Sequence, residues 1–88
     1  MGDLLSGELQ WEIIDVLEDV YPRHLSTEEY DHHFGEKSEN EMVVNLLQLI
    51  EDGIINPQAV MRRLMWPKVN IPALLLTPFG YKLARAED

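Results

Sequence analysis

Apolar residues recur at helical spacing in the first part of the chain, from about residue 6 to residue 20. One face carries Leu9, Ile13, Val16, Leu17 and Val20, with Ile14 and Tyr21 at its border. Acidic residues occupy the opposite face: Glu12, Asp15, Glu18 and Asp19. This period predicts an amphipathic helix over residues 6–20, which Pro22 ends because proline cannot continue the hydrogen-bond ladder.

A second, shorter helix is predicted over residues 27–34. Ser26 and Glu29 have the spacing of a capping box, in which each side chain bonds the other residue's backbone N–H. Leu25 and Tyr30 are placed to form a hydrophobic staple around that box. Gly35 suits a left-handed residue that ends the helix.

A third helix is predicted over residues 39–52. Ser38 and Glu41 repeat the capping-box spacing, and Gly53 follows the last periodic residue. The inward face should hold Val43, Leu46, Leu47 and Ile50, widened by Met42 and Leu49. Only residues 36–38 separate this helix from the second one, which fits the tight turn of a helix-turn-helix.

Residues 54–76 allow two interpretations. Ile54 and Ile55 could form a short strand that the pair Asn56 and Pro57 breaks. Residues 59–66 could then be a strand, or a helix that Asn56 caps and Pro57 begins. We favour the strand, because residues 66–70 resemble a hairpin tip before a second strand over 71–76. Pro72 would need an edge or a bulge in that strand.

The end of the chain predicts a short last helix over residues 78–86. Thr77 can cap it, and Pro78 suits its first position, where a missing N–H costs nothing. The expected fold is therefore α+β, with three helices, an antiparallel hairpin and a short C-terminal helix. It forms one domain over residues 1–88, with residues 1–5 and 87–88 frayed. The expected core is Leu9, Ile13, Leu17, Val20, Tyr30, Phe34, Val43, Leu47, Ile50, Leu75, Phe79 and Leu83.

Composition narrows the possible chemistry. The 88 residues are 45% hydrophobic and include no cysteine, which excludes disulfides and thiolate zinc sites. No apolar run is long enough to span a membrane, and no secretory signal is visible, so we expect a cytoplasmic protein without a membrane partner. A Gly-rich phosphate loop and a recognisable nucleophile are both lacking, so we expect no enzyme activity, cofactor or metal.

Charge is divided unevenly along the chain, whose net charge is −9. Residues 1–53 hold fourteen acids and two strong bases, and residues 54–88 hold five bases and two acids. A nucleic-acid duplex would repel the first part and could approach only the second.

Two stretches resemble the winged helix-turn-helix superfamily of small bacterial and phage proteins. They are residues 46–55, a leucine-rich end of a helix followed by Glu51-Asp52-Gly53-Ile54, and residues 76–81, with the pattern Leu-Thr, two residues, Gly. The resemblance covers about residues 9–85. It implies a three-helix core with a hairpin wing, and it implies that the third helix enters the DNA major groove while the wing contacts the backbone.

Carried over to this chain, the resemblance implies a DNA-binding regulator. Asn40, Asn45 and Gln48 would lie on the outward strip of the third helix, where Asn and Gln can read adenine edges. That strip has no arginine or lysine, and it includes Glu41, Glu51 and Asp52. The wing bases Arg62, Arg63 and Lys68 would contact phosphates, unless they are solvated or pair with acidic helices. A homodimer is plausible because one monomer contacts only a short half-site.

The alternative is an acidic protein-interaction module that does not bind DNA. Trp11 falls within the acidic face of the first helix, and exposed aromatic rings often anchor interfaces. Either the ring faces a partner, or residues 1–5 or the last helix cover it. Trp66 poses the same choice between a partner and packing within the hairpin. The candidate interaction residues are Trp11, Glu12, Asp15, Glu18 and Trp66.

Overall fold

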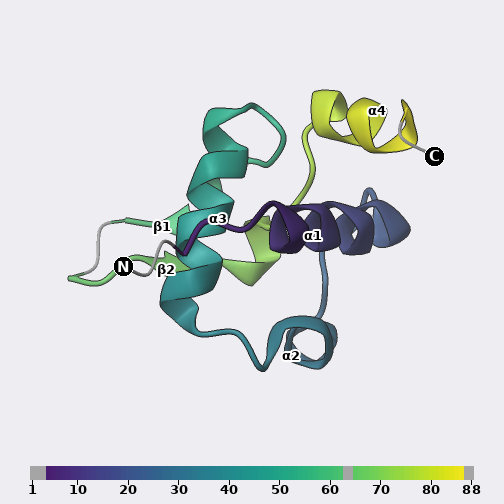
Figure 1. Cartoon of the computed structure of the whole chain (residues 1–88). Helices are drawn as coiled ribbons and strands as arrows, with labels where there is room; N and C mark the ends of the chain where they lie inside the picture. Colours follow the sequence, from purple (N-terminus) through teal and green to yellow (C-terminus); the bar gives the residue numbers. More distant parts are fainter. Residues whose placement is uncertain (1–3, 63–64, 87–88) are drawn as a thin grey trace.

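A computed structural model describes residues 4–62 and 65–86 of the chain, and within them it confirms the α+β prediction. The described residues form four α-helices and a short two-stranded hairpin, which lies at one side of the molecule beside α3 (Figure 1). The helices are α1 (Gly7–Val20), α2 (Thr27–Phe34), α3 (Glu39–Glu51) and α4 (Pro78–Ala86), and the strands are β1 (Val60–Met61) and β2 (Lys68–Val69).

Side-chain caps begin the first three helices, and those of α2 and α3 are the ones that the sequence predicts. Ser6 accepts a hydrogen bond from the first turn of α1. Ser26 and Glu29 form the complete capping box of α2, with bonds of 3.1 and 2.8 Å. At α3 the Ser38 hydroxyl accepts the Glu41 N–H at 3.0 Å, but the described contacts do not include the return bond. These local bonds satisfy N–H groups that the helix itself leaves unpaired.

The core lies between α1, α3 and the segments that precede α4. Of the twelve predicted core residues, Leu9, Ile13, Leu17, Phe34 and Val43 are buried. Six others, Val20, Tyr30, Leu47, Ile50, Leu75 and Leu83, are partly buried. Phe79 was expected there but is 58% exposed, so that prediction is wrong. Ile14 was expected at the border of α1 and is 2% exposed, because α4 packs along α1 and widens its apolar face.

The hairpin differs from its predicted register. β1 and β2 pair Val60 with Val69 and Met61 with Lys68, so residues 68–69, expected at the hairpin tip, belong to a strand. The predicted second strand over 71–76 is wrong, because Ile71–Ala73 is a 3₁₀ turn. Only Leu76 of that segment pairs, in an antiparallel bridge with Ile55.

Both interpretations of the segment before the hairpin are partly correct. Asn56 caps a 3₁₀ turn over Pro57–Ala59, as the helical alternative required, and the two-residue β1 follows directly. The Asn56 side chain accepts the Gln58 N–H at 3.1 Å. Proline at the first turn position thus begins a single turn here, and the extended backbone resumes at Val60.

Two glycines position α4 against the end of α3. Gly53 has a φ of +78°, the left-handed conformation that favours glycine after a helix. A Cβ on Gly80 would overlap the backbone carbonyl oxygen of Ile54 and lie 2.9 Å from its carbonyl carbon. Thr77 joins the same segments by donating to the Gly53 carbonyl at 2.6 Å and accepting the Gly80 N–H at 2.9 Å. Gly35 has a φ of −64°, so its predicted left-handed conformation is wrong.

We expect Gly80→Ala to destabilise the protein, because the new methyl group meets backbone that cannot turn aside. The loss should be about 1–3 kcal/mol of unfolding free energy, measured by urea denaturation. Gly7→Ala is the matched control, since a Cβ there has nothing within 4 Å. It should be neutral or slightly stabilising, and an equal loss at both positions would contradict the close approach of α4.

Candidate functional site

Asn45 of α3, predicted to face outward and read bases, is completely buried. Its Oδ1 accepts hydrogen bonds from the Ser6 N–H at 2.8 Å and the Gln10 amide at 3.0 Å. Its Nδ2 donates to the Leu4 and Glu41 carbonyls, both at 2.9 Å. Every donor and acceptor of the amide is therefore used inside the protein, and the predicted base-reading role of Asn45 is wrong. The predicted fraying is also wrong at Leu4; residues 1–3, 87 and 88 lie outside the described residues.

The sequence contained a signal for this burial. Met42, Leu46 and Leu49 are spaced i, i+4 and i+7, and each is at most 2% exposed. Asn45 stands at i+3 of the same series, so it lies on that face. The prediction centred the face on Leu47 and Ile50, which are only partly buried, and so rotated the helix away from its true orientation.

The rest of the predicted base-reading strip on α3 is polar and acidic. Asn40 is exposed, and Gln48 is half-buried and donates to the Asp52 carboxylate at 3.2 Å. Glu51 and Asp52 are exposed at the end of the helix. A phosphate backbone that approached this strip would meet carboxylates without a neighbouring arginine or lysine on the helix.

The hairpin carries the two most exposed large hydrophobic residues of the described part of the chain, Met65 and Trp66. Met65 is 86% exposed, Trp66 75% and Met61 38%. Arg62 and Lys68 are also exposed. We call these five residues the hairpin patch. Arg63, the third predicted wing base, lies outside the described residues. The sequence left open whether the Trp66 ring packs within the hairpin or faces a partner. At 75% exposed, the ring is not buried within the hairpin.

The two strands of the hairpin lie beside α3 (Figure 1), and several contacts anchor them there. The Glu39 carboxylate, in the first turn of α3, accepts the Val69 N–H at 2.7 Å. The backbone of the next residue, Asn70, donates to the Ala59 carbonyl at 2.7 Å. Val60 and Val69 turn their side chains into the core. The patch is therefore presented on a hairpin whose two strands are held by buried side chains and by the hydrogen bond to Glu39.

The acidic face of α1 is a second exposed surface. Trp11 is 42% exposed, so neither of the covering segments considered from the sequence buries it. Glu12, Asp15 and Asp19 are exposed around it, and we call these four residues the α1 acidic face.

Glu18 belongs to the contact between α1 and α4. Its carboxylate lies 3.9 Å from the Arg85 guanidinium, and its side chain is only 14% exposed. The rings of Tyr21 and Tyr81 stack beside them with centroids 4.1 Å apart, and Arg85 lies 5.9 Å from the Tyr81 centroid. Glu18 therefore fastens α4 to α1, and its predicted place on an open interaction surface is wrong.

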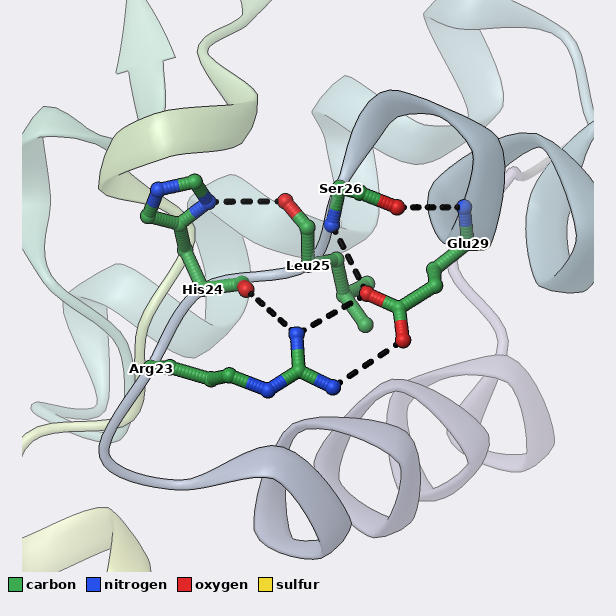
Figure 2. Close-up of polar contacts among 5 residues, drawn as sticks. All are labelled: Arg23, His24, Leu25, Ser26 and Glu29. Atoms are coloured by element: carbon green, nitrogen blue, oxygen red, sulfur yellow. Dashed lines mark hydrogen bonds and ion pairs between the residues drawn. The ribbon is translucent and has the colours of Figure 1, made fainter.

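A polar cluster precedes α2 (Figure 2). The Arg23 guanidinium donates to both carboxylate oxygens of Glu29 at 3.0 Å and to the His24 carbonyl at 3.1 Å. Glu29 also accepts the Ser26 N–H at 2.8 Å. These bonds, first those from Arg23 and then that from Ser26, lower the pKa of Glu29 from 4.5 to about 2. The cluster holds the loop in place and uses its groups internally, so it is structural.

The described residues do not bring together the side chains of a metal site. They contain no group of three or more histidine, aspartate or glutamate side chains arranged to hold a metal ion. Burial, and then the Glu39 charge, raises the pKa of Tyr30 to about 12, so its hydroxyl stays protonated. No described helix combines the length and the apolar character that a bilayer crossing requires.

We expect Asn45→Ala to lower the unfolding free energy by about 2–4 kcal/mol, because it removes a buried amide and leaves its partners unpaired. Hydrogen exchange of the Ser6 amide should also accelerate, since that N–H loses its acceptor. Asn40→Ala, at an exposed position of the same helix, is the matched control and should change neither measurement. An Asn45→Ala protein with unchanged stability would show that the amide does not hold the N-terminal segment.

The contribution of the Arg23–Glu29 cluster to folding stability should decrease at acidic pH. Because the folded pKa of Glu29 is depressed, its stabilising contribution is complete above pH 4.5 and is lost as the pH falls towards about 2. Arg23→Gln should raise the Glu29 pKa towards 4.5, as followed by the carboxyl carbon resonance in an NMR titration. Lys37→Gln removes an exposed cation elsewhere and should leave the titration unchanged. A Glu29 that titrates near 4.5 in the unmodified protein would refute the bidentate ion pair.

Comparisons of the chain with protein-family models, with curated proteins and with solved structures gave no match.

Proposed function

We propose that this protein is a non-enzymatic, winged-helix-like module that binds another protein through its hairpin patch. The order of elements supports the winged-helix assignment: three helices, then a 3₁₀ turn and a hairpin, and a closing helix. Four residues, Gly35 to Ser38, join α2 to α3, which suits a helix-turn-helix. In this assignment the hairpin is the wing.

The observation that carries the proposal is the exposure of Trp66 and Met65 at 75% and 86%. Burying such side chains is favourable, so a fold that leaves them on a projecting hairpin favours contact with a partner. Tryptophan, methionine and arginine are the residue types enriched at the centres of protein interfaces, and the patch contains all three. Anchoring by Glu39 supports the proposal too, because a held hairpin loses less conformational entropy on binding.

DNA binding is the second candidate function. Because α3 offers no basic residue and Asn45 is buried, DNA contact would depend on the wing. Arg62 and Lys68 are exposed and could contact phosphates. Among the described residues, the ion pairs join Arg23 to Glu29 and Arg85 to Glu18, and neither involves Arg62 or Lys68. Against this candidate stand the burial of Asn45, the acidic end of α3 and the net charge of −9, which weaken attraction to a polyanion.

A photo-crosslinking amino acid at position 66, installed in the cells that express the chain, tests the proposal. We expect a discrete adduct of increased mass that survives nuclease treatment. The matched control is position 79, another exposed aromatic site, which should give no adduct. An adduct that nuclease shortens would favour the DNA candidate, and the absence of any adduct specific to position 66 would refute both.

A further inference from the structure

We propose that the partner of the hairpin patch is a second copy of this chain, and that the patch binds the α1 acidic face of that copy. This inference rests on the proposed function, since it names the protein that the hairpin contacts. It follows from two exposed surfaces of the same molecule whose chemistry is complementary.

Charge complementarity is the first argument. The hairpin patch presents Arg62 and Lys68, and the α1 acidic face presents Glu12, Asp15 and Asp19, all exposed. Asp15 and Asp19 are one helical turn apart, with Glu12 beside them, so the three carboxylates lie along one side of α1. Opposite charges at close range favour this pairing and disfavour contact between two hairpins or two α1 faces.

Each surface also has an aromatic anchor at the place where its charges gather. Trp66 follows Met65 and lies two residues before Lys68, and Trp11 lies on the same side of α1 as Asp15. The two rings are 75% and 42% exposed. Docking the hairpin on α1 would remove both rings from water and place the cations among the carboxylates, which is the arrangement of a central apolar contact with a charged rim.

In a two-fold dimer, the contact between the hairpin patch and the α1 acidic face forms twice. The hairpin of each copy lies on α1 of the other, which closes the assembly and avoids the open chains that one-way docking produces. Forming the contact twice doubles the buried surface area. This increase is needed because one short hairpin buries little area, whereas stable interfaces bury about 1,200–2,000 Å² in total. The −9 charge of each copy opposes association, but this longer-range repulsion is screened beyond about 8 Å at physiological salt.

Sedimentation velocity of the purified full chain over a series of concentrations at physiological salt tests the proposal. We expect a monomer–dimer equilibrium whose dissociation constant rises at least about tenfold in Trp66→Ala and in Trp11→Ala. Phe79→Ala, at a 58% exposed aromatic site on α4, is the matched control and should leave the dissociation constant unchanged. Circular dichroism of each variant establishes that it remains folded.

A charge exchange tests the pairing itself. The first variant carries Arg62→Glu and Lys68→Glu, and the second carries Glu12→Lys and Asp15→Lys. Each should be monomeric alone, because its hairpin and its α1 face have the same sign of charge. An equimolar mixture should form a heterodimer, since both hairpin–helix contacts are then opposite in charge.

The charge controls change net charge equally at other exposed positions. Lys37→Glu with Lys82→Glu matches the first variant, and Glu28→Lys with Asp31→Lys on α2 matches the second. Both controls should still dimerise.

Three results would overturn the inference: a wild-type chain that stays monomeric, a dimer that persists in Trp66→Ala, or variants that fail to associate when mixed. The proposed function fails separately, in the crosslinking experiment. A monomeric chain whose position 66 crosslinks to a different protein would refute the second copy as partner and leave the hairpin patch as the binding surface.

Discussion

The buried amide of Asn45 is the interaction on which the arrangement of α1 and α3 depends. A polar side chain without exposure is unfavourable unless all its hydrogen bonds are made, and here Ser6, Gln10, Leu4 and Glu41 supply all four. Three of these partners belong to the start of the chain. The amide therefore fixes where α1 begins relative to the middle of α3, and a shift of either helix by one residue would leave buried polar groups unpaired.

The same helix also determines where the hairpin lies. Glu39 is the first residue of α3, and its carboxylate accepts the Val69 N–H. At one end α3 thus holds β2, and at its middle it holds the N-terminal segment. Its other end meets α4 through the Thr77 hydroxyl and the close approach of Gly80 to Ile54. Because α3 contacts other elements at both ends and at its middle, it acts as the scaffold of the fold, and it holds the hairpin that carries the exposed patch.

Local signals were enough to predict the helices, and non-local contacts explain what was missed. Ser26 with Glu29, and Thr77 with Pro78, act on backbone groups within four residues, so their spacing alone identified the helix starts. The role of Asn45 depends on Leu4 and Gln10, which are remote in sequence. Hairpin register likewise depends on the burial of Val60 and Val69 beneath α3, whereas the apolar run before Thr77 suggested a strand that the structure replaces with a 3₁₀ turn.

Local patterns also predicted part of the candidate site, and non-local contacts again explain the part that was missed. Exposure of Trp11 could be predicted, because the period of α1 turns it away from the core. Glu18 lies on the same side of that helix, yet it contacts Arg85, because α4 returns along α1 and supplies a cation that no local pattern announces. Glu18 and Asn45 are therefore not part of an open surface. The exposed cations of the hairpin and the exposed carboxylates of α1 remain as two surfaces of opposite charge. These two exposed surfaces carry opposite charges on the same chain, and that complementarity is the basis of the proposed contact between two copies.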